Sequence, residues 1–137
     1  MTAKKYLVPM SCPDINKDDK QAVLETLETN YLSIGPKIRT FEQSLLDYTG
    51  AAHAIGVNSG TSGLHLCIRA AGISEGDLVI TTPFSFVSST NVILFENAIP
   101  VFVDVDPRTG NIDPLQVKQA AADITSGDPD ILRKWLP

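Results

Sequence analysis

The first fifty residues carry apolar positions with the period of two amphipathic α-helices. The first helix is predicted within residues 16–30, where Asn16 can cap the opening turn. The second is predicted to begin at Pro36, a residue favoured in a first helical turn, and to end at Gly50. The apolar stripes of the two helices comprise Val23, Leu24, Leu27, Ile38, Phe41, Leu45 and Tyr48.

The following seventy residues alternate between short apolar runs and helical patterns. The apolar runs show little polar alternation, and we expect strands at residues 52–57, 78–81 and 100–105. The helical patterns cover residues 62–71, 85–98 and 114–122, the last opening with the capping pair Asp113-Pro114. Strands without polar alternation that are separated by helices indicate an α/β fold with a largely parallel sheet and flanking helices.

This pattern divides the chain into three parts. Residues 1–50 are predicted to be an N-terminal helical segment, and residues 51–122 a partial α/β domain. Residues 123–137 are expected to be a truncated tail; the family resemblance described below implies that it is part of an insertion.

Composition narrows the functional classes. The net charge is −5 and the 11 basic residues are scattered, which argues against nucleic acid as a partner. There is no basic amphipathic helix, no apolar run long enough to span a membrane and no secretory leader, so we expect a cytoplasmic protein without a membrane partner. Cys12 and Cys67 lack metal-type spacing, so we expect no metal site and two buried or idle thiols in a reducing compartment, with a disulfide between them as the open alternative.

Candidate chemistry gathers in the sequence NSGTSG, residues 58–63 and hereafter the 58–63 turn. Small and hydroxyl-bearing residues at the start of a predicted helix suit a phosphate group, which accepts hydrogen bonds from backbone N–H groups there. The spacing matches neither a Walker loop nor the G-x-G-x-x-G dinucleotide motif. A capped helix whose glycines only allow close packing is the alternative that these residues leave open.

Four motifs together carry a resemblance to a known family. They are G-P-x-x-x-x-F-E at 35–42, S-G-T at 59–61, G-D-x-V-I-T at 76–81 and P-V-F-V-D-V-D at 100–106. Over residues 10–122 the chain resembles the DegT/StrS family of sugar aminotransferases, which depend on pyridoxal 5′-phosphate (PLP). The resemblance implies that the chain is an incomplete large domain of the aspartate-aminotransferase (type I) fold.

The resemblance also implies roles for individual residues. Thr61 and Ser62 correspond to positions that hold the cofactor phosphate, with Gly60 in the same turn. Phe86 corresponds to an aromatic position that stacks on the pyridine ring of the cofactor, where it orients the ring and favours its electron-sink form.

Several other residues could be part of a site or could be purely structural. Tyr31 and Gly35 lie in a loop that borders the sugar site in relatives, although a plain connector between helices explains them equally. His65 is expected to be packed in the core rather than to act as an acid or base. Asp104 and Asp106 are expected to cap the turn that follows the third strand.

PLP chemistry requires a lysine that carries the cofactor and an acidic partner for the ring nitrogen. Both come from later segments in the family, and no lysine here, Lys118 included, has a matching context, so we predict no catalytic residue in this chain. The expected function is an N-terminal fragment, inactive alone, of a homodimeric enzyme. That enzyme would transfer an amino group, with glutamate as the expected donor, to a nucleotide-linked keto-sugar. The alternatives are a fragment of a related PLP-dependent sugar dehydratase and a non-catalytic remnant.

Overall fold

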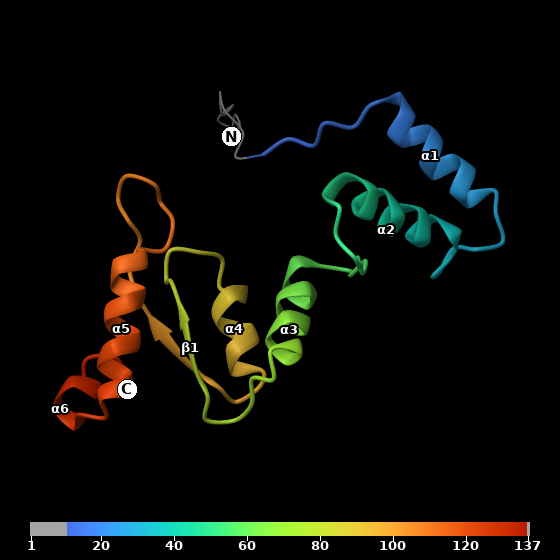
Figure 1. Ribbon diagram of the computed structural model, residues 1–137. Coiled ribbons are helices and arrows are strands. Elements are labelled where there is room, and N and C mark those ends of the chain that lie inside the picture. The colour runs from blue at the N-terminus through green and yellow to red at the C-terminus, as the bar shows by residue number, and fades with distance from the viewer. Residues whose placement is uncertain (1–10, 137) are drawn as a thin grey trace, which may run out of the picture. The chain divides into compact units, whose positions relative to one another are not determined.

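The computed structural model in Figure 1 describes residues 11–136 of the 137-residue chain. The chain forms two compact units, Met1–Gly56 and Val57–Pro137. Helices α1 and α2 belong to the first unit, whereas the second contains helices and a pair of parallel strands. The α/β class that the sequence predicts is therefore confirmed.

Helix α1 (Lys17–Leu27) begins with the cap that its sequence predicts. The side chain of Asn16 accepts hydrogen bonds from the backbone N–H groups of Asp18 and Asp19, at 2.7 and 3.3 Å. In return, the Asp19 carboxylate accepts the backbone N–H of Asn16 at 2.8 Å, which completes a capping box. These local bonds fix the helix start without any contribution from a core.

Helix α2 (Pro36–Thr49) is bounded by two glycines. Gly35 precedes Pro36 in extended conformation, and Gly50 ends the helix in the left-handed region with φ of 70°. Neither α1 nor α2 contains a buried residue, and the apolar stripes of both helices are largely exposed. Local signals therefore define both helices, while their apolar faces stay accessible in this chain.

The strand predicted at residues 52–57 is wrong. This stretch adopts no strand conformation, and within residues 11–136 it pairs with no other strand. A strand depends on a neighbouring strand to accept its ladder hydrogen bonds, and an apolar run alone does not supply one. The backbone N–H of Gly56 bonds instead to the Glu42 side chain, 14 residues earlier.

The second unit is built around two parallel strands, β1 (Leu78–Thr81) and β2 (Ile99–Phe102). Their register pairs Leu78 with Ile99 and Thr81 with Phe102. Helix α3 (Gly60–Ala70) precedes β1, and helix α4 (Ser88–Leu94) connects β1 to β2. Figure 1 shows α3 and α4 side by side, both beginning at the end of the strand pair where β1 finishes.

A small apolar core joins these elements. Val92 and Ile93 of α4 are buried together with Ala98, and Ile68, Ile73 and Val79 pack against them. Val101 of β2 is also fully buried. Burial of side chains of this size contributes about 1.5–3 kcal/mol each, so this cluster is what holds α3, α4 and the strands together.

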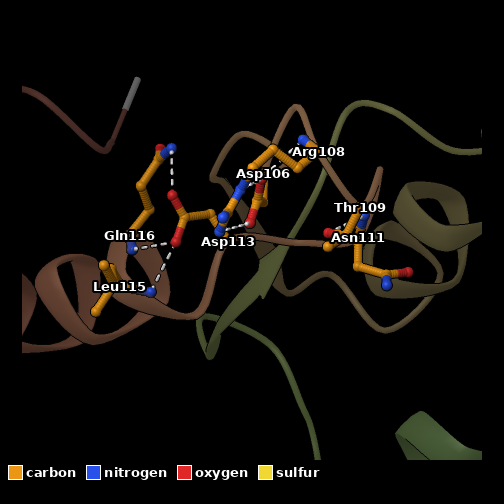
Figure 2. A network of polar contacts seen from close by, with 7 residues as sticks. All are labelled: Asp106, Arg108, Thr109, Asn111, Asp113, Leu115 and Gln116. Atoms are coloured by element: carbon orange, nitrogen blue, oxygen red, sulfur yellow. Dashed lines mark hydrogen bonds and ion pairs between the residues drawn. The ribbon is translucent and has the colours of Figure 1, made fainter.

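The third predicted strand, at residues 100–105, is confirmed only over β2. One further ladder bond follows Phe102, from the Val103 backbone N–H to the Thr81 carbonyl at 2.9 Å, and Val105 then forms an isolated antiparallel bridge with Ile112. Between them lies a tight polar turn, shown in Figure 2, in which the Asp106 carboxylate accepts the backbone N–H of Arg108 at 2.8 Å. This bond and the Arg108 side chain hold the pKa of Asp106 below its ordinary value. Asp106 therefore caps the turn as expected.

Helix α5 (Pro114–Ser126) starts at the predicted position and continues beyond residue 122. Asp113 caps it by accepting the backbone N–H of Leu115 at 2.8 Å (Figure 2). A short helix α6 (Pro129–Leu132) follows, and the Trp135 indole N–H donates to the Asp123 carboxylate at 2.9 Å. The tail is thus folded back onto α5 by a defined contact.

Candidate functional site

The 58–63 turn forms the start of α3, and its serines are engaged with one another. Ser59 is the N-cap and accepts the backbone N–H of Ser62 at 3.1 Å. The Ser62 hydroxyl donates to the Asn58 side chain at 2.7 Å and lies 3.0 Å from the Ser59 hydroxyl. Ser62 is therefore used to build the turn, through an Asn58 contact that sequence reasoning missed although the two residues are one helical turn apart.

Gly60 and Thr61 present the donors that remain available. Within residues 11–136 the backbone N–H groups of both residues, and the Thr61 hydroxyl, have no hydrogen-bond partner. A Cβ placed on Gly60 would meet nothing within 4 Å, so the space beside this residue is open. Two N–H groups and one hydroxyl at a helix start are suited to an oxyanion, because the helix dipole favours negative charge there.

The segment that connects β1 to α4, residues 82–87, lies at the same end of the strands as the start of α3 (Figure 1). Its two aromatic side chains are exposed, Phe84 at 71% and Phe86 at 76%. The Phe86 carbonyl accepts both the backbone N–H and the hydroxyl of Ser89, at 3.1 and 3.0 Å. The backbone at Phe86 is therefore fixed while its ring remains free to contact a ligand.

In the first unit, Tyr31 and Gly35 line one hollow of about 270 Å³. The other lining residues are Ile34, Pro36 and Arg39. A Cβ on Gly35 would lie 2.9 Å from the Tyr31 Cβ and 3.1 Å from its carbonyl oxygen, so only glycine allows this approach. The two residues that sequence analysis placed at a substrate site therefore belong to one surface feature, together with an arginine that it missed.

Similarity to known proteins shows the family of this chain. A sequence model of the DegT/DnrJ/EryC1/StrS aminotransferase family matches residues 13–127. The chain belongs to this family. The resemblance inferred from the sequence is thereby confirmed.

Two of the similar proteins show how far the likeness extends. The spore coat polysaccharide biosynthesis protein SpsC of Bacillus subtilis is 45% identical over 117 residues, which are 85% of this chain and 30% of SpsC. The UDP-4-amino-4-deoxy-L-arabinose–oxoglutarate aminotransferase of Shewanella sediminis is 42% identical over 99 residues, 72% of this chain and 26% of that protein. This chain therefore spans less than a third of the length of these relatives.

Solved structures give the same result for the fold. The PLP form of Spr1654 from Streptococcus pneumoniae matches with a TM-score of 0.77 and 33% identity. The match covers 84% of this chain and 29% of Spr1654. The described α/β unit is therefore part of the fold that this aminotransferase family uses, as the resemblance implies.

The sequence predicts that His65 is simply packed in the core, and the structure differs from this prediction. Its Nε2 lies 2.5 Å from Glu96 Oε1, and the His65 side chain is 31% exposed. The ring also meets Phe95 edge to face, with centroids 5.3 Å apart. Glu96 is 31 residues away in the sequence, so no local pattern could have indicated this pair.

The two cysteines and Lys118 lie outside the 58–63 turn, residues 82–87 and the hollow around Gly35. Cys12 and Cys67 are free, exposed thiols, and Lys118 is exposed on α5. Among the described residues, no group of three or more His, Cys, Asp or Glu side chains could hold a metal ion. None of the helices in residues 11–136 combines the length and apolarity needed to cross a membrane.

Proposed function

We propose that this chain is the N-terminal part of a PLP-dependent aminotransferase that acts on a nucleotide-linked keto-sugar, with glutamate as the amino donor. The family assignment supports the reaction class. The names of two relatives support the substrates: SpsC functions in polysaccharide biosynthesis, and the Shewanella protein pairs a UDP-sugar with oxoglutarate, the keto acid that glutamate becomes.

The observation that carries this proposal is the set of free donors at the start of α3. The backbone N–H groups of Gly60 and Thr61 and the Thr61 hydroxyl would hold the phosphate of PLP, and Ser62 would keep the turn in shape through Asn58. A helix N-terminus stabilises an anion by about 0.3–1 kcal/mol when exposed and by up to about 2 kcal/mol when partly buried. The residues present therefore fit the phosphate group of the cofactor.

Phe86 and the hollow around Gly35 have complementary roles in this proposal. When bound, PLP acts as an electron sink for the amino acid from which the amino group is taken. The exposed Phe86 ring would stack on the pyridine ring and orient it, and exposed Phe84 offers a second aromatic surface in the same segment. Tyr31 and Gly35 would border the sugar of the second substrate.

The lysine that carries PLP would come from a later segment, so this chain alone would not transfer amino groups. In the complete enzyme, by which we mean the product of the gene that contains this segment, we expect a homodimer in the cytoplasm. The first test of the missing lysine is to sequence the gene beyond codon 137. An in-frame continuation to a lysine that follows an acidic strand residue supports the proposal, and a stop codon in its place contradicts it.

The phosphate role is tested by Thr61→Val in the complete enzyme, because valine keeps the shape of threonine and removes the hydroxyl. We expect PLP affinity to fall by about 1.5 kcal/mol or more, the scale of a hydrogen bond to a charged group, measured by absorbance titration. Thr125→Val on α5 is the matched control, since the Thr125 hydroxyl bonds only to carbonyls of its own helix. Equal PLP affinities for wild type and Thr61→Val would contradict the phosphate role, and the 58–63 turn would then be only a capped helix start.

A further inference from the structure

The sequence offers no function for His65 and Glu96, yet they join α3 to the end of α4. Besides the 2.5 Å contact with His65, Glu96 Oε1 lies 3.8 Å from Arg69 Nε, one turn further along α3. The Glu96 side chain is only 19% exposed, and Phe95 covers the His65 ring edge to face at an interplanar angle of 70°. Two residues of α3 thus converge on two residues that directly follow α4.

This cluster lies close to the 58–63 turn along a rigid element. His65 is four residues after Thr61, so both lie on the same face of α3, about 6 Å apart along the helix axis. The apolar core contacts α3 further on, at Ile68. The His65–Glu96 contact is therefore well placed to resist rotation of the first turn of α3 about the helix axis.

We infer that the His65–Glu96 pair is a positioning pair, which holds Gly60 and Thr61 at the orientation in which they receive the cofactor phosphate. This inference rests on the proposed function. A hydrogen bond to a carboxylate is short and directional, so it fixes the angle at which α3 meets α4 better than apolar contacts do. The same angle sets how the donors of the 58–63 turn face the segment that carries Phe86.

The test compares PLP with pyridoxal, which lacks the phosphate, in the complete enzyme. Glu96→Ala should weaken PLP binding about tenfold, while pyridoxal affinity changes by less than about twofold. Glu96→Gln retains an oxygen that can accept the His65 N–H, so it should recover most of the lost PLP affinity. Gln119→Ala is the matched control, because it removes a side-chain contact of similar length, 2.6 Å to Asp123, on helix α5.

The outcomes of this test distinguish failure of the positioning role from failure of the proposed function. Equal losses of PLP and pyridoxal affinity, or no loss, would overturn the positioning role and leave the proposed function intact. A wild-type enzyme that binds pyridoxal as tightly as PLP would overturn the phosphate site and this inference with it. If Glu96→Ala does not fold, as judged by circular dichroism, Glu96→Asp replaces it, because the shorter carboxylate should show the same selective loss of PLP affinity.

Discussion

The backbone N–H of Gly56 donates to Glu42 Oε1 at 2.8 Å, which ties the end of the first unit to helix α2. Glu42 closes the G-P-x-x-x-x-F-E run, and its side chain is half-buried at this contact. A Cβ at Gly56 would collide with the end of the Ile38 side chain. The run therefore holds the segment that leads to the 58–63 turn through a side-chain acceptor and a close backbone approach.

Glu42→Ala should release this segment. We expect amide hydrogen exchange at Gly56 to accelerate about tenfold, since loss of one hydrogen bond of this kind corresponds to about 1–1.5 kcal/mol. Gln43→Ala is the control, because Gln43 contacts only Asp47 on the exposed surface of α2 and should leave the Gly56 amide unaffected. Unchanged exchange at Gly56 in Glu42→Ala would contradict a holding role for Glu42.

Gly35→Ala should destabilise the loop before α2. The added methyl group would lie against the Cβ and carbonyl of Tyr31, which are backbone-anchored atoms that cannot rotate away. We expect a loss of about 1–3 kcal/mol in urea unfolding, the range for overpacked sites. Gly60→Ala, where the new methyl group meets open space, should change stability by less than about 0.5 kcal/mol. Equal effects of the two substitutions would exclude the steric explanation.

The contact of Trp135 with Asp123 should depend on pH. Hydrogen bonds from the Trp135 indole and the Gln119 amide lower the pKa of Asp123 below its ordinary value of 3.8. The unfolded tail then binds a proton more readily than the folded one, so the contribution to stability is complete above pH 3.8 and is lost as the pH falls through the lower folded pKa.

Trp135 reports this transition by fluorescence, because it is the single tryptophan of the chain. We expect its emission to shift in the wild type as the pH falls below 3.8, and to be independent of pH over that range in Asp123→Asn. Asp106→Asn is the control, since the lowered pKa of Asp106 belongs to a different turn. A persistent acid transition in Asp123→Asn would contradict the assignment.

The isolated chain should expose apolar surface to solvent. Ile34 and Tyr48 are 96% and 90% exposed, and Leu27 and Leu32 line an apolar hollow of about 390 Å³ in the first unit. Such surfaces favour association. We expect binding of the dye ANS and concentration-dependent light scattering, both reduced by the double substitution Leu27→Ser and Leu32→Ser. A monomer that melts sharply and binds no dye would contradict this expectation.

Sequence reasoning located α1, α2 and the start of α5 because their boundaries depend on neighbouring residues, whereas the helix predicted at 85–98 is confirmed only over Ser88–Leu94 and α6 was not predicted. Asn16 with Asp19, Gly50, and Asp113 with Pro114 each end or begin a helix through bonds that span at most four residues. The parallel pairing of β1 with β2 followed from the helix between them, since a crossover of this kind brings consecutive strands together. The run at 52–57 is also mostly apolar, but it has no partner strand among the described residues, and it is not a strand.

The sequence by itself determined the family, the capped start of α3 and the presence of Gly60 and Thr61 where an anion can approach. These features are local, because a helix N-terminus exposes its own N–H groups wherever it lies. Only the tertiary structure decided that His65 meets Glu96 and that the Phe86 ring is exposed. The contacts of His65 and the exposure of Phe86 depend on how α3 and α4 pack against each other and against the strands, and no spacing along the chain encodes that geometry.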